Sequence, residues 1–243
     1  MSKSMSRIIS VFIVLLSVLV TQGQTDAQCI DMVKKYNEQI RKLGKPATGK
    51  VYYVDFEQEL NYWDSDVNSP KQRVKYYVSA DQVHLISSEI STYTNKEYVF
   101  TVMHKQKKIL VSRNPESDPE FDGAGIFGTF LNNQEQIISN ATLSECSEVS
   151  EKGLFKVVLD VSQLKINGFH ADKLTYYFDS KTKKLKKTIT SYGKGYQLRR
   201  MSITYYDFQT DYKYTFPKDL VGMFLDSKGK LKPKYNGYEL ITN

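Results

Sequence analysis

The strongest constraint on the fold is an alternation of apolar and polar residues that begins at residue 51. In Val51–Trp63 the even positions are mainly apolar, whereas the odd positions include Asp55, Glu57 and Glu59. Successive side chains of a β-strand point to opposite faces, so this pattern predicts a long strand with one buried face and one wet face. Four later segments continue the alternation: Arg73–Ser79, Gln82–Thr94, Glu97–His104 and Ile109–Ser112. Together they predict an antiparallel meander of about five strands.

A second run of strands is predicted in the C-terminal half. Leu143–Ser150 and Leu154–Val161 come first, and Phe169–Pro217 then has the pattern of three long antiparallel strands. Asp179–Thr182 and Gly193–Gly195 supply the turns between these three strands. The chain contains 18 Tyr and 12 Phe, residues that favour half-buried strands over helices. The predicted fold class is therefore mainly β (α+β).

Met1–Ala27 has the features of an export signal. Lys3 and Arg7 give a positively charged start, and Ile8–Val20 is an apolar run too short to span a bilayer comfortably. An uncleaved N-terminal anchor is the alternative interpretation of the same residues. We expect a cleavable signal peptide over residues 1–27, a single mature domain over residues 28–243, and export to the periplasm.

The mature chain is predicted to begin with one amphipathic helix. In Cys29–Leu43 the apolar residues Ile30, Val33 and Ile40 recur at helical spacing, which predicts a helix that covers one face of the sheet. Cys29 and Cys146 are the two cysteines of the mature chain. An even number of cysteines in an exported protein permits one disulfide, and two isolated thiols are the alternative.

A Gly-rich apolar stretch interrupts the strand pattern at the middle of the chain. In Gly123–Leu131 the residues Ile126, Phe127, Phe130 and Leu131 lie close together between glycines, ahead of a weakly helical Asn132–Asn140. One interpretation is a mobile lid or plug over the open face of the sheet. The alternative is a core helix that crosses the mouth of a barrel.

The sequence offers no candidate for catalysis. His84, His104 and His170 lie in separate strand contexts without metal-ligand spacing, and no nucleophile elbow, phosphate loop or zinc-protease motif occurs. We therefore expect a protein that is not an enzyme, with no metal and no cofactor. The formal net charge is +7, and for an exported chain no nucleic acid partner is expected.

A curved sheet with one apolar face can bind an apolar ligand by enclosing it. Acyl chains suit such a site because each buried methylene contributes roughly 0.8 kcal/mol without directional bonds. The alternative is that the same face is a filled core. Candidate lining residues come from the first meander and the central stretch: Tyr52, Val54, Phe56, Leu60, Val74, Tyr76, Val78, Phe100, Val102, Ile126, Phe127, Phe130 and Leu131.

The order of these features resembles that of the periplasmic outer-membrane lipoprotein carrier superfamily, which includes LolA-like, LolB-like and RseB-like proteins. The best local match runs from Leu174 to Pro217: a strand ending in Phe178-Asp179, a short turn, alternating Leu185 and Ile189, a Gly pair, a Tyr-rich strand and Phe216-Pro217. The resemblance implies an unclosed β-barrel, or half-barrel, whose concave face is covered by helices. It also implies a cavity for lipoprotein acyl chains, no enzymatic activity and no cofactor. The Arg that latches the lid in that family has no assignable position here.

The expected function is therefore binding of lipid or lipoprotein acyl chains in the periplasm, with transfer towards the outer membrane. Inner- and outer-membrane envelope proteins are the expected protein partners, and the chain is expected to be a monomer. The alternative function is a non-enzymatic envelope interaction or sensor module that uses the same fold to bind a protein.

Overall fold

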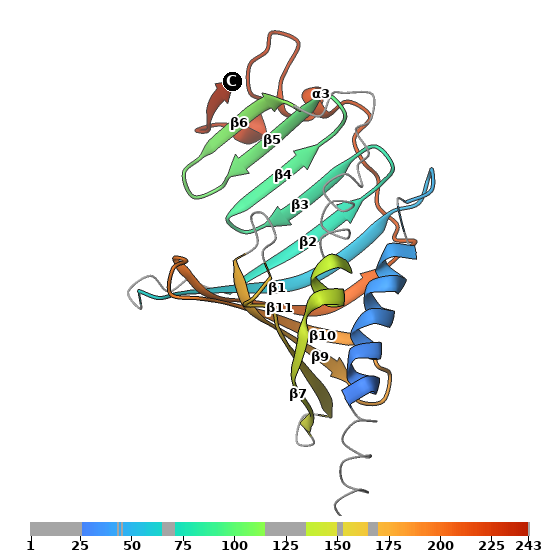
Figure 1. Ribbon diagram of the computed structural model, residues 1–243. Helices are drawn as coiled ribbons and strands as arrows, with labels where there is room; N and C mark the ends of the chain where they lie inside the picture. Colours follow the sequence, from blue (N-terminus) through green and yellow to red (C-terminus); the bar gives the residue numbers. More distant parts are fainter. Residues whose placement is uncertain are drawn as a thin grey trace, which may run out of the picture.

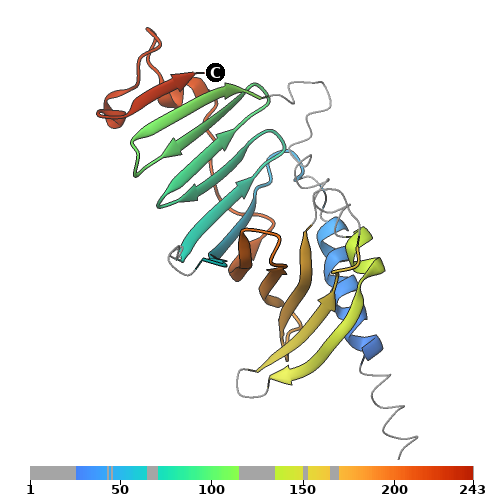
Figure 2. The ribbon, with the colours of Figure 1, turned by 60° about the vertical axis from the view of Figure 1, so that its left-hand side comes forward.

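A single open sheet runs through the whole molecule, from β12 at one edge to β7 at the other (Figures 1 and 2). The computed structural model describes residues 26–42, 44, 46–64, 71–114, 135–149, 153–164 and 170–242. Within these ranges the sheet has 12 strands in the order β12-β6-β5-β4-β3-β2-β1-β11-β10-β9-β8-β7. The two edges do not meet, so the prediction of a mainly β, unclosed half-barrel is confirmed.

The first six strands form one half of the sheet and follow the predicted meander. They are β1 (Tyr52–Tyr62), β2 (Gln72–Val78), β3 (Val83–Ser87), β4 (Ile90–Thr94), β5 (Tyr98–Met103) and β6 (Lys108–Arg113). The prediction of one strand over Gln82–Thr94 was wrong, because a turn divides it into β3 and β4. Ser87 Oγ accepts from Ile90 N at 3.1 Å and donates to Ile90 O at 2.6 Å, which stabilises that turn in place of a continuous strand.

The remaining strands form the other half and one edge. They are β7 (Thr142–Val149), β8 (Leu154–Asp160), β9 (Ala171–Asp179), β10 (Leu185–Tyr192), β11 (Leu198–Gln209) and β12 (Glu239–Thr242). β11 pairs with β1 and so joins the two halves, while β12 pairs with β6 in parallel. The predicted turn at Asp179 is present, since Asp179 Oδ1 accepts from Lys181 N and Thr182 N at 3.1 and 2.7 Å.

A helix over residues 26–42 covers one side of β7–β10, which we call the helix face. Cys29 and Val33 are fully buried there against Val157, Tyr176 and Phe178. A short helix over residues 135–140 adds Ile137 and Ile138 to the same cluster. Cys29 forms a disulfide with Cys146 of β7, with the Cα atoms 6.3 Å apart, so the N-terminal helix is tied covalently to the edge of the sheet.

The C-terminal segment after β11 covers the opposite side of the sheet, which we call the tail face. It contains α3 (Leu220–Phe224) and the 3₁₀ turn η2 (Pro233–Tyr235), and it packs over β1–β6 rather than over β7–β10. Phe224 stacks on Phe100 with ring centroids 4.4 Å apart, and Tyr214 stacks on Tyr77 at 4.0 Å. The helix over residues 26–42 and the segment after β11 therefore cover opposite faces of opposite halves of the sheet.

Two predicted segments lie partly or wholly outside the described residues. The signal peptide was predicted over residues 1–27, of which 1–25 are not described, and the lid residues Ile126, Phe127, Phe130 and Leu131 are not described either. Within the described ranges, no helix combines the length and apolar character needed to cross a membrane.

Candidate functional site

An apolar band on the helix face of β1, β2 and β11 is the candidate site. In the β1–β2 ladder Val54 lies opposite Tyr76 and Phe56 opposite Val74. In the β1–β11 ladder Val54 lies opposite Phe208, Phe56 opposite Tyr205, and Leu60 opposite Met201. Register partners share a face, so these three strands present one continuous surface of large apolar side chains.

A row of register partners connects this band to the surface under the N-terminal helix. Across the sheet the row reads Val157, Tyr176, Thr188, Ile203, Gln58 and Gln72. Val157 and Tyr176 lie in the cluster under the helix, whereas Ile203 and Gln58 lie within the band. The band and the helix-covered cluster are thus two parts of one face.

Among the described residues of these three strands that have a register partner in the β1–β2 and β1–β11 ladders, the helix face carries no charged side chain. On that face β1 contributes Tyr52, Val54, Phe56, Gln58, Leu60 and Tyr62, β2 contributes Gln72, Val74, Tyr76 and Val78, and β11 contributes Met201, Ile203, Tyr205 and Phe208. The tail face of the same strands carries Asp55, Glu57, Glu59, Arg73, Lys75 and Asp207. Because the helix face is uncharged and the opposite face of the same strands is strongly charged, an apolar ligand is expected to contact the helix face only.

Side chains of the band are mostly half-buried, not sealed into a core. Val74 and Val78 are buried, but Tyr52, Val54, Phe56 and Leu60 keep partial access to solvent. Phe208 is 46% exposed and extends the apolar surface formed by the other side chains of the band. The band therefore has apolar surface left to bury against a ligand or partner.

Tyrosine hydroxyls supply the polar groups at the centre of this face. Burial raises the pKa of Tyr76 to about 12, and it also raises the pKa values of Tyr36, Tyr176 and Tyr205. The hydroxyl of Tyr205 is close enough to those of Tyr36 and Tyr176 to raise their pKa values further. These groups stay neutral at physiological pH and can donate or accept hydrogen bonds without bringing charge into the band.

The structure brings together part of the predicted lining set. The predicted residues of β1 and β2 lie on the helix face: Tyr52, Val54, Phe56, Leu60, Val74, Tyr76 and Val78. Phe100 and Val102 do not join them. Phe100 belongs to the tail-face row that runs through Tyr53, Tyr77, His84 and Tyr93, and it is sealed under Phe224 together with Val102.

β11 contributes residues that the sequence interpretation missed. Met201, Ile203, Tyr205 and Phe208 lie beside β1 on the helix face. Their alternation was visible within the predicted strand Tyr196–Phe208, but nothing in it indicated a pairing with β1, which precedes it by more than a hundred residues. Long-range pairing of this kind has no local sequence signal.

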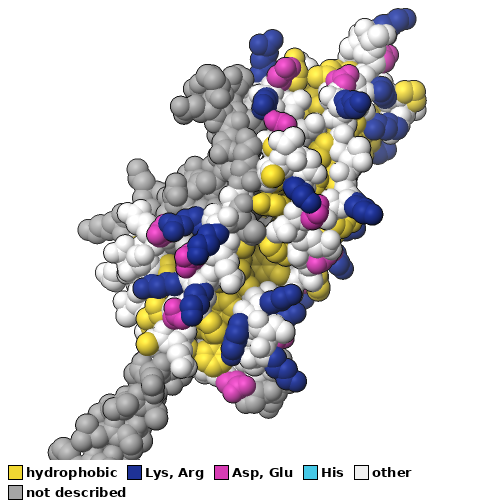
Figure 3. All heavy atoms as spheres, turned by 90° about the vertical axis from the view of Figure 1, so that its right-hand side faces the viewer, with side chains coloured by type: hydrophobic (Ala, Val, Ile, Leu, Met, Phe, Trp, Pro, Cys, Tyr) yellow, Lys and Arg dark blue, Asp and Glu magenta, His cyan; other side chains and the backbone are white. Residues whose placement is uncertain are grey.

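A cleft of about 370 Å³ lies on the helix face at its other end, between the N-terminal helix and β8. Met32, Tyr36 and Phe155 are its large hydrophobic lining residues, and the others are Gln28, Asp31, Lys35, Gln39 and Lys183. Figure 3 faces this side and shows hydrophobic side chains in a strip bordered by Lys and Arg. The volume is at the small end of the range of ligand sites.

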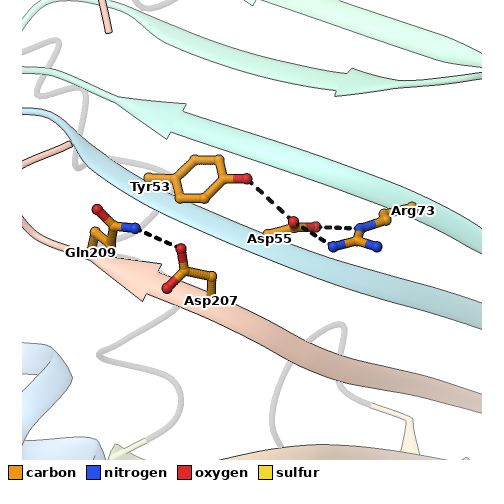
Figure 4. Close-up of polar contacts among 5 residues, drawn as sticks. All are labelled: Tyr53, Asp55, Arg73, Asp207 and Gln209. Carbon is orange, nitrogen blue, oxygen red and sulfur yellow. Dashed lines mark hydrogen bonds and ion pairs between the residues drawn. The ribbon is translucent and has the colours of Figure 1, made fainter. Parts of the chain in front are cut away.

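The polar cluster on the tail face is built for stability rather than chemistry. Arg73 donates from Nε and Nη2 to the two oxygens of buried Asp55 at 2.8 and 2.7 Å, and Tyr53 Oη donates to Asp55 at 3.3 Å (Figure 4). Hydrogen bonds from Arg73 hold the pKa of Asp55 below its usual value, so this carboxylate stays charged and occupied. In the part of the chain that is described, no three His, Cys, Asp or Glu side chains gather in a way that could hold a metal ion.

Comparisons with known proteins find weak structural similarity and no sequence match. No family model and no curated protein matches the sequence. Among solved structures, an uncharacterised conserved protein from Thermus thermophilus is 9% identical, with a TM-score of 0.40 over 89% of this chain and 98% of that one. A DUF1329 family protein from Desulfovibrio piger is 6% identical, with a TM-score of 0.37 over 78% and 94%. A LolA superfamily protein from Nitrosomonas europaea is 8% identical, with a TM-score of 0.29 over 77% and 94%. TM-scores this low carry no functional argument, so function must be argued from the geometry of the chain itself.

Proposed function

We propose that this protein binds the acyl chains of a lipid or lipoprotein on the helix face of its sheet, in the periplasm. The observation that carries the proposal is the uncharged, half-buried band over β1, β2 and β11. Each methylene moved from water onto such a surface contributes roughly 0.8 kcal/mol, so a single acyl chain can be held without directional contacts. The protein acts as a carrier and not as an enzyme, and lipoprotein transfer towards the outer membrane is its role.

Two further features support the proposed compartment. The Cys29–Cys146 disulfide is of a kind that persists in oxidising compartments such as the periplasm. The leader over residues 1–27 has the charge and apolar pattern of an export signal. Donor and acceptor proteins in the inner and outer membranes are the partners that a carrier of this kind requires.

Acyl binding can be tested with a fluorescent fatty acid titrated into the purified mature protein. We expect saturable binding that is competed by an unlabelled lipid. Phe208→Asp should weaken binding about tenfold or more, because it places a charge in the band and removes an aromatic contact. Phe208 is already 46% exposed, so this change should leave the fold intact.

Gln209→Asp is the matched control for that experiment. Gln209 is the next residue of β11 and lies opposite Tyr53 on the tail face, so its variant introduces the same charge on the other side of the sheet. Equal weakening by both variants, or no binding of the probe at all, would refute the proposal. If native mass spectrometry of periplasmic material finds a stable protein complex and no lipid, the alternative of a protein-binding sensor module replaces it.

A further inference from the structure

A second exposed apolar surface lies at the end of the sheet where β1 ends and β11 begins. Here the end of β1, the start of β9 and the β10–β11 turn come together, and Figure 1 shows the first and last of these side by side at the left. Trp63, which follows β1, is 41% exposed and Tyr196, in the turn, is 43% exposed. We call the described residues 61–64, 170–173 and 191–200 the aromatic tip.

Hydrogen bonds and ring stacking hold the aromatic side chains in place. Trp63 Nε1 donates to Gly193 O at 3.2 Å, and Tyr196 N donates to the same carbonyl at 3.0 Å. Tyr196 stacks on Tyr192 with ring centroids 4.9 Å apart and on His170 at 5.5 Å. Large aromatic rings are thus fixed on the surface, and the indole N–H of Trp63 is hydrogen-bonded, an arrangement that resembles the interfacial aromatic residues of membrane proteins.

A β-bulge directs an arginine onto the tryptophan. Asn61 pairs with Arg200 and Tyr62 with Leu198, so Arg199 is the extra residue in β11. Its guanidinium lies 5.5 Å from the centre of the Trp63 ring. Arg200 donates from Nε and Nη2 to Asn61 Oδ1 at 3.0 and 2.7 Å. These contacts with a neutral ring and a neutral amide hold both guanidinium groups at the tip.

The charge of the tip complements an anionic surface. Lys173, Lys194, Arg199 and Arg200 are its cations, and Asp64 and Asp172 are its carboxylates. Exposed Trp and Tyr rings next to an excess of Lys and Arg match the boundary between lipid headgroups and acyl chains, where the rings enter the interface and the cations bind phosphate. A small-molecule pocket does not explain the same residues, because none of them lines the cleft beside the N-terminal helix.

We propose that the aromatic tip docks the protein onto the surface of a membrane that contains anionic lipid. This inference does not rest on acyl binding, because the side chains that carry it, Trp63, Tyr196 and the cations of the tip, are not among the residues from which acyl binding was argued. A tip that touches the bilayer would orient the sheet with β1 and β11 running away from the membrane, and these are the strands that carry the band.

The chain provides its own reporter for a test, because Trp63 is its only tryptophan. Vesicles of mixed phosphatidylglycerol and phosphatidylcholine are titrated into the purified mature protein while Trp63 emission is recorded. We expect a shift to shorter wavelength, quenching by lipids brominated on their acyl chains, and weaker binding at high salt. Pure phosphatidylcholine vesicles should bind much more weakly, and Lys194→Gln and Arg199→Gln should each reduce affinity about fivefold.

The other bulge of β11 supplies matched controls. There Tyr206 is the extra residue, 51% exposed, with the Arg73 guanidinium 4.5 Å from its ring centre. Tyr196→Ser should weaken vesicle binding, whereas Tyr206→Ser and the exposed tail-face variant Lys75→Gln should not. The proposal is overturned if Trp63 emission does not respond to anionic vesicles, if vesicles bind without a change in that emission, or if both sets of variants behave alike. A response to solubilised envelope proteins but not to vesicles would make the tip a protein interface and would also overturn it.

Discussion

His84 is a buried imidazole in the middle of the aromatic cluster on the tail face. Its Nδ1 lies 2.9 Å from Tyr214 Oη, and its ring contacts Tyr93 and Phe216 with centroids 4.7 Å away in each case. Tyr77, Tyr93 and Tyr214, the titratable groups around it, are neutral at acidic pH. Burial lowers the pKa of His84 to about 4, so the folded state holds this ring neutral.

The position of His84 predicts a loss of stability in mild acid. The unfolded chain takes up a proton near pH 6.5, whereas folded His84 does so only near pH 4. The free energy of unfolding should therefore fall as the pH drops between these values, by up to about 1.4 kcal/mol per pH unit from this group. Urea unfolding at a series of pH values measures it. His84→Phe keeps a ring in place but cannot titrate, and an unchanged pH slope in that variant would exclude His84 as the cause.

Asp55 and Asp207 test how much a carboxylate on the tail face stabilises the sheet. They are register partners, but Asp55 is buried and bound by Arg73 and Tyr53, whereas Asp207 is exposed and contacts Gln209 (Figure 4). Asp55→Asn should lower the free energy of unfolding by about 2 kcal/mol at neutral pH, because it removes a charge-assisted bidentate bond. Asp207→Asn should cost less than about 0.5 kcal/mol.

The stabilisation that Asp55 contributes to the folded state should be lost in acid. Arg73 lowers the pKa of Asp55 below its usual value, so the stabilisation is fully present above the pKa of an unfolded Asp, about 3.9, and is lost as the pH falls further. The difference between the wild type and Asp55→Asn in chemical unfolding should therefore shrink below about pH 4. A difference that stays constant down to pH 2 would mean that the bond to Arg73 does not depend on the charge of Asp55.

At the scale of elements, alternation predicted where the strands lie but not which way each strand faces. The period of two located β1, β2, β5 and the strands of the second half, because apolar residues must alternate on a sheet with one wet face. Phe100 was assigned to the same face as Tyr52, yet the register places it on the opposite one. The number of residues in a turn decides which face of the sheet the apolar residues of the next strand occupy. The turn between β3 and β4 was not predicted.

The C-terminal segment that covers the tail face, with α3, could not be predicted for a different reason. α3 is only five residues long, and within it only Leu220 and Phe224 are buried. A single turn of helix leaves no periodic signal, and its stability comes from packing against Phe100 rather than from propensity. The N-terminal helix could be predicted because it is long enough for an apolar stripe to repeat.

The disulfide makes the N-terminal helix part of the sheet domain. Cys29 and Cys146 are separated by 117 residues, so the bridge closes a long loop in the unfolded chain. In the chain-entropy model such a bridge contributes about 4 to 5 kcal/mol. Reduction of the native protein should lower the urea midpoint accordingly. A Cys29→Ser/Cys146→Ser variant should have the lower midpoint already and should not respond to reductant, and a response in that variant would exclude the bridge as the cause.

At the scale of the whole molecule, the described residues form apolar cores on both sides of the sheet. The N-terminal helix and the strands β7–β10 form the core on the helix face, whereas on the tail face α3 packs on β4–β6 and residues 212–216 pack on β1 and β2. β1 and β11 lie between them and join the halves through backbone hydrogen bonds. Because each core is completed by a different end of the chain, local opening of one half does not require loss of the other.

The independence of the two halves can be measured by making the same Phe→Ala substitution in each core, at Phe224 and at Phe178. Both are fully buried phenylalanines, Phe224 in the tail-face core and Phe178 in the helix-face core. Changing either to Ala should cost about 3 to 5 kcal/mol. In amide hydrogen exchange, Phe224→Ala should accelerate exchange in β4–β6 and leave β8–β10 protected, and Phe178→Ala should do the reverse. Equal acceleration throughout the sheet in both variants would show that the β1–β11 ladder couples the two halves into one cooperative unit. A ligand bound on the helix face would then also stabilise the tail-face core.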